Sequence, residues 1–432
     1  MLVNSDRLDT RRSEAIYARA VGLLPGGVNS PVRAMRAIGR DHPIFVARGE
    51  GFELIDVDGH RYIDWVCSWG PLILGHARSN VVLAVRAAAA RGTSFGAPTE
   101  AEVALAAEVT DRFASIEMVR MVSSGTEATM SAVRLARAAT GRDAVVKFAG
   151  AYHGHVDGLL AEAGSGLATQ AIPASPGVTA AQAADTIVVP WNDPDALHAA
   201  LARREVAAIL AEPIPANMGV VPPARGFLDL LRSSADERGA LLLLDEVITG
   251  FRVARGGAQE LYGVRADLTI LGKVLGGGLP AAAYGGRREL MSLVAPAGDV
   301  YQAGTLAGNP LAVAAGLATL ERLDGEAYAR LRELTSALAG GLRDAADGLP
   351  VQVASVPGML TVFFSAEPVR DFAGVAACDL DAYGRFCRAL LERGIYTPPS
   401  QFEAWFVSLA HDSAAIERTV EAAGEAFAEA LE

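Results

Sequence analysis

Lysine is almost absent from this sequence. Only two of its 432 residues are lysines, Lys147 and Lys273, so nearly all of its basic side chains are arginines. Arginine cannot form a Schiff base, because its guanidinium keeps its proton at neutral pH. Any chemistry that needs a free amine is therefore confined to two positions.

Cysteine is also scarce, and long apolar runs are missing. The three cysteines form no CxxC pair, and they stand at Cys67, Cys378 and Cys387. A disulfide framework or a zinc site is therefore not expected, and a reducing cytoplasm fits. The N-terminal segment has no apolar core of the kind that signal peptides have, and its acidic residues argue against a transit peptide. No apolar run approaches the ~20 residues needed to span a bilayer.

Positive charge is in deficit, with a net charge of −12. Such a surface repels nucleic acid and anionic lipid, so neither is expected as a partner, and a small-molecule substrate is expected instead. Hydrophobic residues make up 51% and charged residues 20%, which is typical of globular proteins.

The order of expected elements indicates the fold class. The first ~75 residues predict a helix near Arg12–Leu24 and a small meander of strands. Seven short apolar runs then alternate with helical stretches, which predicts an α/β fold with a mostly parallel seven-stranded sheet covered by helices. These runs are Met118–Val122, Ala144–Phe148, Thr186–Val189, Val206–Ala211, Ala240–Leu244, Leu268–Leu271 and Ala281–Tyr284.

The chain becomes strongly helical after Asn309, with one clear strand at Met359–Phe364. We therefore expect three parts. Residues 1–75 form an N-terminal segment that joins the small domain, residues 76–310 form a large domain, and residues 311–432 form a C-terminal α+β domain.

Two chemically suited side chains follow buried strands. Asp245 ends the run that begins at Ala240, and Lys273 follows Leu268–Leu271 and precedes three glycines. In open α/β sheets, ligands bind beyond the carboxyl ends of the strands. There, Asp245 could hold a proton on a ring nitrogen and Lys273 could form a Schiff base. The alternatives are a turn-capping acid and a surface lysine. Lys147 lies inside a strand and is expected to be structural.

Two further segments complete a pattern. Ser124, Gly125 and Thr126 follow a strand and open a helix, whose N-terminus can bind phosphate; an ordinary N-cap is the alternative. Tyr152 follows the next strand and could stack on a planar cofactor, or be a core aromatic. The nearby His153 and His155 lack the i, i+4 spacing of a helical metal pair, and no metal site is expected. Together, the phosphate cradle, stacking ring, acid and amine predict pyridoxal 5′-phosphate (PLP) as cofactor.

Several long strings in this sequence carry a resemblance to a known family. They include LPGGVNSPVRA, SSGTEATMSAVRLARAATGRD, LLLDEVITGFR, VYQAGTLAGNP and PPSQFEAWFVSLAH. With them, the chain resembles the class III aminotransferase group of fold type I PLP-dependent enzymes, and within that group the glutamate-1-semialdehyde 2,1-aminomutases. The resemblance covers nearly the whole chain.

The resemblance implies a role for each matching residue. Lys273 would carry the cofactor and move protons, Asp245 would pair with its ring nitrogen, and Thr305 would reach its phosphate from the second subunit of a homodimer with shared active sites. Other cofactor contacts would come from Ser124, Gly125, Thr126, Tyr152, Asn217 and Val247. Substrate contacts would come from Ser30, Arg33, Trp69, Ser165 and Glu403.

The implied reaction is an amino exchange within one substrate, which turns glutamate-1-semialdehyde into 5-aminolevulinate for tetrapyrrole biosynthesis. The resting cofactor would be the pyridoxamine 5′-phosphate (PMP) form. Glu403 would serve as a catalytic discriminator, because related ω-aminotransferases commonly place an arginine there for an α-carboxylate. The segment between His155 and Val178 would be a lid over the site.

Two alternatives remain open at this point. A class III ω-aminotransferase with a separate amino acceptor would use the same residues, and a cofactor-binding protein without catalysis would keep some of them. The sequence also departs from the family pattern at Pro215-Ala216, at Ala149 and Ala151, and at Trp405, which stands where a glycine is typical. Of these, Trp405 is expected nearest the pocket, where it could change the pocket's shape.

Overall fold

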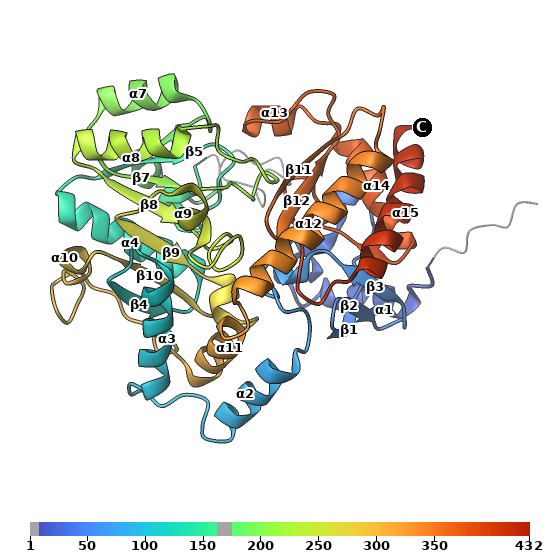
Figure 1. Cartoon of the computed structure of the whole chain (residues 1–432), viewed down its shortest axis with the longest axis horizontal. Coiled ribbons are helices and arrows are strands. Elements are labelled where there is room, and N and C mark those ends of the chain that lie inside the picture. The colour runs from blue at the N-terminus through green and yellow to red at the C-terminus, as the bar shows by residue number, and fades with distance from the viewer. Residues whose placement is uncertain (1–7, 162–174) are drawn as a thin grey trace, which may run out of the picture.

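The computed structural model describes residues 8–161 and 175–432. Its largest element is a seven-stranded sheet, drawn in one half of the molecule in Figure 1. Among the described strands of this sheet, β10 alone runs opposite to the other six, so the predicted α/β class with a mostly parallel sheet is confirmed. The strands in order across the sheet are β4 (Met118–Val122), β10 (Ala282–Gly286), β9 (Leu268–Leu271), β8 (Leu241–Asp245), β7 (Val206–Ala211), β5 (Ala144–Phe148) and β6 (Thr186–Val189).

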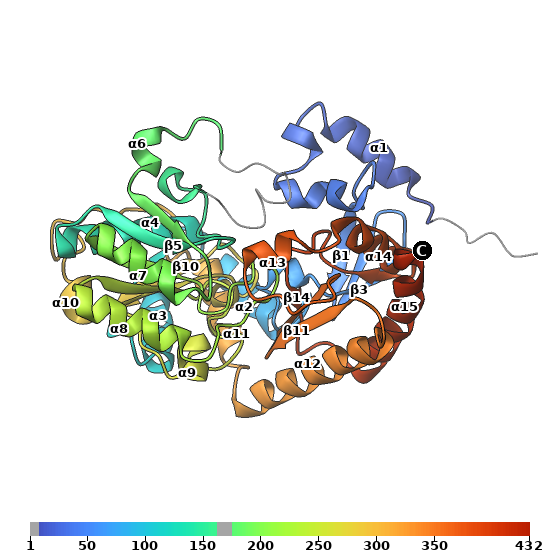
Figure 2. The same cartoon turned by 90° about the horizontal axis from the view of Figure 1, so that it is seen from above.

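Both faces of this sheet are buried, because successive side chains of a strand point to opposite faces. In β8, Leu241 and Leu243 pack in one core with helix α4 (Gly125–Thr140). Leu242 and Leu244 pack in a second core with α8 (Phe227–Arg238) and α7 (Pro194–Arg203). Figure 2 shows α4 on one side of the sheet and α7 and α8 on the other. This explains why the central strands read as continuous apolar runs.

Further helices lie around the large sheet. Four of them are α2 (Ser79–Ala89), α3 (Glu100–Arg112), α9 (Gly257–Tyr262) and α11 (Pro310–Leu320). Two shorter ones are α6 (Ala180–Ala183) and α10 (Arg288–Met291).

The other half of the molecule combines the two ends of the chain. One sheet contains four strands, which follow one another across it in the order β1 (Val46–Glu50), β2 (Glu53–Asp56), β3 (Arg61–Asp64) and β13 (Ile395–Tyr396). In it, the C-terminal β13 runs parallel to the N-terminal β3. This pairing supports a small domain built from both ends, while the boundaries at residues 75 and 310 remain a prediction.

A three-stranded sheet and long helices complete this half. The sheet consists of β11 (Gln352–Val356), β12 (Met359–Phe363) and β14 (Trp405–Phe406). The helices are α12 (Gly325–Ala345), α13 (Phe372–Ala376), α14 (Leu380–Glu392) and α15 (Ser413–Leu431), with α1 (Arg11–Ala20) at the N-terminal end. Within the described ranges, no helix is long and apolar enough to cross a membrane.

Candidate active site

A cavity of about 400 Å³ opens at the carboxyl edge of the large sheet. Eight residues singled out from the sequence line it together: Ser124, Gly125, Thr126, Tyr152, Asn217, Asp245, Val247 and Lys273. They follow five different strands of one sheet, whose carboxyl ends the topology brings to a common edge. The lining also includes His153 and Glu212, for which the sequence reasoning predicted no role in the site.

The carboxylate of Asp245 is held at both oxygens. Nδ1 of His153 lies 2.8 Å from Oδ2, and the backbone N–H of Val247 donates to Oδ1 at 3.0 Å. Both Asp245 and His153 are buried, so the acid is fixed toward the cavity. The sequence carries no signal for this role of His153, because its partner Asp245 lies 92 residues away along the chain.

Glu212 organises a second part of the wall from a fully buried position after β7. Its Oε1 accepts the backbone N–H of Tyr152 at 2.9 Å. Its Oε2 accepts the N–H of Ala216 at 3.1 Å and Nδ2 of Asn217 at 3.0 Å. Burial raises the pKa of the Glu212 carboxyl. The rule that drew attention to Asp245, an acid at a strand end, would also have found Glu212.

Lys273 begins the short 3₁₀ helix Lys273–Gly276 with a left-handed φ of 48°. A non-glycine residue in this region stores strain, which is typical of functional sites. Burial lowers the pKa of its amine, while the carboxylates of Glu403, Glu212 and Asp245 act in the opposite direction. A larger neutral fraction of the amine suits a nucleophile and proton carrier.

The N-terminus of α4 faces the cavity and is also capped. Oγ of Ser124 accepts the N–H of Glu127 at 3.2 Å, and Oε2 of Glu127 accepts the N–H groups of Ser123 at 2.6 Å and Ser124 at 3.1 Å. The capping alternative for Ser124 is therefore confirmed. The N–H groups of Gly125 and Thr126 belong to the first helical turn, which intrahelical bonds do not use.

The chain approaches this helix terminus closely at Gly154. A Cβ added to Gly154 would lie 2.5 Å from Oγ1 of Thr126 and 2.6 Å from its Cα. Oγ1 of Thr126 also accepts the N–H of His155 at 3.3 Å. The loop after β5 thus packs directly on the helix N-terminus, which brings Tyr152 beside it.

The remaining predicted residues do not line this cavity. Ser30 and exposed Arg33 lie on or next to the 3₁₀ helix Pro31–Ala34, and Ser30 borders a separate hollow. Trp69 ends the 3₁₀ helix Cys67–Trp69 with a φ of 68°. Exposed Thr305 lies in a surface hollow beside Phe95 and Thr99. Ser165 and the middle of the predicted lid lie outside the described residues.

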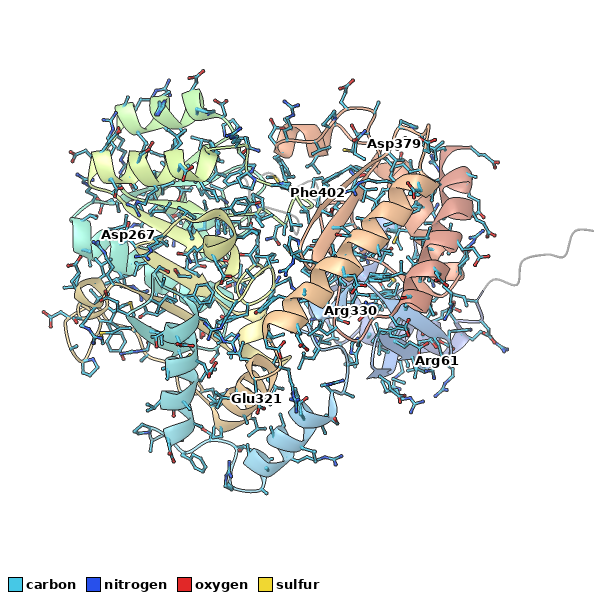
Figure 3. The ribbon with its side chains drawn as sticks, in the orientation of Figure 1. Arg61, Asp267, Glu321, Arg330, Asp379 and Phe402 are labelled. Atoms are coloured by element: carbon cyan, nitrogen blue, oxygen red, sulfur yellow. The ribbon has the colours of Figure 1, made fainter. Side chains whose placement is uncertain are left out.

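Glu403 lies on the loop before β14, half-buried. The preceding residue anchors this loop to the large domain, because the carbonyl of Phe402 accepts the N–H of Gly219 at 2.6 Å. Figure 3 shows Phe402 where the two halves of the molecule meet. Burial is the largest cause of the shifts in both site groups: it lowers the pKa of Lys273 and raises that of Tyr152, and the charge of Glu403 acts on both to raise their pKa values.

Lys147 and Trp405 both lie away from the cavity lining. Lys147 is fully buried, and its Nζ donates to the carbonyls of Leu159 at 2.9 Å and Ala161 at 3.2 Å, which confirms its structural role.

Trp405 does not line the cavity; it is fully buried in the core of the small domain and stacks on Phe386. The expectation that it could change the pocket's shape directly is therefore wrong. In residues 8–161 and 175–432, no group of His, Cys, Asp or Glu side chains is arranged to hold a metal.

Comparison with known proteins agrees with this geometry. The family model for class III aminotransferases matches residues 35–422. A glutamate-1-semialdehyde 2,1-aminomutase of Roseiflexus castenholzii is 58% identical over 97% of this chain and 98% of its own.

Solved structures are similar over nearly the whole chain as well. An ω-transaminase from Sphaerobacter thermophilus has a TM-score of 0.91 at 32% identity, covering 97% of this chain and 98% of its own. A glutamate-1-semialdehyde-aminomutase variant from Pseudomonas aeruginosa PAO1 in complex with PMP has a TM-score of 0.86 at 29% identity, covering 97% of this chain and 94% of its own. This chain belongs to the class III aminotransferase family.

Proposed function

We propose that this chain is a glutamate-1-semialdehyde 2,1-aminomutase, which converts (S)-4-amino-5-oxopentanoate to 5-aminolevulinate in tetrapyrrole biosynthesis. A relative of that name is 58% identical over 97% of this chain, which supports the proposed reaction. The choice within the family rests on Glu403, whose negative charge acts on the amine of Lys273. An acid at this position repels a second substrate carboxylate and favours a substrate with an amine or aldehyde at that end.

PLP, with its PMP form, is the cofactor in this proposal, and the cavity fits it. The N–H groups of Gly125 and Thr126, at the start of the 16-residue helix α4, suit a phosphate. Gly154 leaves room only for a bare backbone beside Thr126. Asp245, fixed by His153, suits a protonated ring nitrogen. When bound, the cofactor supplies an electron sink for charge that develops on the substrate carbon.

Residues of the chain supply the remaining steps. The amine of Lys273, partly neutral because burial lowers its pKa, takes a proton from one carbon and returns it to another. Tyr152, Val247 and Asn217 line the cavity, where the first two would pack against the cofactor ring and Asn217 would offer its side-chain amide to it. Arg33 and Ser30 bind the substrate carboxylate, for which a guanidinium offers two parallel hydrogen bonds. Trp69 does not border the cavity itself; in this proposal it would contact the substrate farther out.

A homodimer is part of the proposal. Large apolar side chains are exposed around α2, α3 and the segment before α11: Leu83 63%, Phe95 52%, Val103 68%, Tyr301 72% and Leu306 54%. An apolar surface of this kind marks an interaction site. Thr305 lies in the same region, away from the cavity of its own chain. A residue that contacts the phosphate site of a partner subunit must lie at such a surface.

A cytoplasmic place of action is also proposed. It is supported by the three cysteines, all of which are buried free thiols. Buried thiols without disulfides are typical of reducing compartments.

The second candidate is an ω-aminotransferase with a separate amino acceptor, and the likeness to the S. thermophilus ω-transaminase favours it. The two activities differ in their need for a second substrate. With glutamate-1-semialdehyde alone, an aminomutase turns over continuously, whereas an aminotransferase stops after about one equivalent per site. Addition of pyruvate or 2-oxoglutarate restarts only the aminotransferase.

A further inference from the structure

Arg252 is a buried cation next to the site. Its side chain is 0% exposed. Within the described part of the chain, its guanidinium donates to three backbone carbonyls and to no carboxylate. Nη1 donates to Val407 at 3.0 Å and Gly358 at 3.3 Å, and Nη2 donates to Gly70. A buried charge without a counter-ion is costly and therefore calls for a reason.

The three carbonyls come from three segments of the small domain. Gly70 follows the helix that ends at Trp69, Gly358 forms the turn between β11 and β12, and Val407 follows β14. Arg252 itself belongs to the loop after β8, which lies in the other half of the molecule (Figure 1). The guanidinium therefore joins the small domain to the loop that follows Asp245.

Phe406 stands between Arg252 and Lys273. Cζ of Arg252 lies 5.0 Å from the centroid of its ring, and Nζ of Lys273 lies 5.9 Å from the same centroid. The guanidinium and the amine thus lie over one aromatic ring, which keeps the two side chains close to each other. Gly70 packs against both Phe406 and Lys273. A Cβ added to Gly70 would lie 3.0 Å from the Phe406 ring and 3.4 Å from Cδ of Lys273.

We propose that Arg252 is a positioning residue for Lys273: it holds Phe406 and Gly70 against the lysine side chain, and its unpaired charge favours the neutral amine. The inference rests on the role proposed for Lys273 as proton carrier. Arg252 does not touch the cavity itself, and no substrate contact is assigned to it.

The charges around Lys273 come from four elements. Glu212 after β7, Asp245 at the end of β8 and Glu403 before β14 all raise the pKa of its amine, whereas burial, the largest cause, and Arg252 lower it. Burial also lowers the pKa of Arg252, to about 10, so Arg252 remains charged at neutral pH. Among the described residues, Arg252 is thus the cation whose charge opposes these three acids at Lys273.

The scarcity of lysine makes this proposal directly measurable. In the full chain freed of cofactor, trace acetylation at different pH values, read by mass spectrometry, reports the amine of Lys273 separately from that of Lys147. Lys147 is fully buried, so its labelling reports any loss of the fold. No substrate or cofactor is needed.

Two variants form a matched pair. Arg252→Gln keeps hydrogen-bond donors and removes the charge, whereas Arg252→Lys keeps the charge and loses the planar fork. We expect the wild-type midpoint of Lys273 to lie below the ordinary value of about 10.4. Arg252→Gln should raise it by roughly one pH unit, and Arg252→Lys should leave it near the wild-type value.

Three results would overturn the proposal: an ordinary midpoint in the wild type, no rise in Arg252→Gln, or equal rises in both variants. If Arg252→Gln does not fold, an ordinary midpoint in the wild type, or a midpoint in Arg252→Lys that is raised above the wild-type value, would still overturn the proposal. An ordinary Lys273 midpoint in an active aminomutase would contradict this inference alone. A lowered midpoint in a folded chain that makes no 5-aminolevulinate would contradict the proposed function alone.

Discussion

Nδ1 of His153 donates a hydrogen bond of 2.8 Å to Oδ2 of Asp245, and the pair lies buried beneath the cavity. Because a carboxylate only accepts, this bond fixes the tautomer and the orientation of the imidazole. The pair presents a fixed carboxylate to the cavity, and a protonated ring nitrogen is the kind of ligand group that such a carboxylate binds.

Replacement of His153 by Asn should weaken PLP binding without abolishing it. A hydrogen bond to a charged group contributes about 1.5–3 kcal/mol, so we expect the Kd for PLP to rise about 10- to 100-fold. Absorbance titration of the apoenzyme measures this Kd. The exposed neighbour His155 is the control, since His155→Asn should leave the Kd unchanged. An unaltered Kd in folded His153→Asn would show that the pair does not support the cofactor.

Gly154→Ala should damage the phosphate end of the site. Gly154 has a φ of +83°, and the added Cβ would meet Thr126 at 2.5 Å. Gly141, at the other end of α4, has a φ of +66° and nothing within 4 Å of an added Cβ. Each alanine should cost about 1–2 kcal/mol for its left-handed backbone. Only Gly154→Ala should add a clash with Thr126 and weaken PLP binding. Urea unfolding measures the loss of stability, and PLP titration measures the loss of affinity. Equal losses of stability and affinity in the two variants would refute the close approach of Gly154 to Thr126.

Trp405→Gly should affect stability rather than substrate choice. Trp405 is fully buried and stacks on Phe386, and removal of a large core side chain typically costs about 3–5 kcal/mol. Thermal unfolding should detect this loss. The ratio of kcat/KM for the semialdehyde to that for other amine acceptors should stay constant in the folded enzyme. A changed ratio would mean that Trp405 shapes the pocket after all.

Acid should destabilise the small domain through His411. This side chain stacks on Trp65 with ring centroids 3.9 Å apart, its Nδ1 accepts the N–H of Ser408 at 3.0 Å, and burial lowers its pKa to about 4. Because its ordinary pKa is about 6.5, the unfolded chain binds a proton there first as the pH falls. His411 should therefore remove about 2 kcal/mol of stability between pH 7 and pH 5.

The variant His411→Phe keeps the ring and removes the titrating group. Urea unfolding at both pH values, followed by tryptophan fluorescence, should show a smaller loss in the variant than in the wild type. Identical losses in the two proteins would exclude His411 as a source of the pH dependence.

Local patterns were sufficient to predict the large sheet and most of its carboxyl edge. Apolar runs such as Leu241–Leu244 identify buried strands, and the side chain that follows each strand must lie at the common edge. Asp245 and Lys273 were found in this way. The short strands β13 and β14, two residues each, escaped prediction because their pairing depends on contacts with distant segments.

Contacts between distant segments also explain what was missed in the site. His153 and Arg252 act through partners that are far away in sequence, such as Asp245 for His153 and Val407 for Arg252. No spacing rule reports such pairs. Trp405 was expected near the pocket because it lies two residues after Glu403, yet its side chain packs in the core of the small domain and stacks on Phe386.

The most direct test of the central claim is the formation of 5-aminolevulinate by the purified, PLP-loaded protein with glutamate-1-semialdehyde as the only substrate. The account predicts many turnovers per active site without any amino donor or acceptor, and none in Lys273→Ala. Formation that stops at about one equivalent and resumes only with an added oxo acid or amine would contradict it, as would continued turnover in Lys273→Ala.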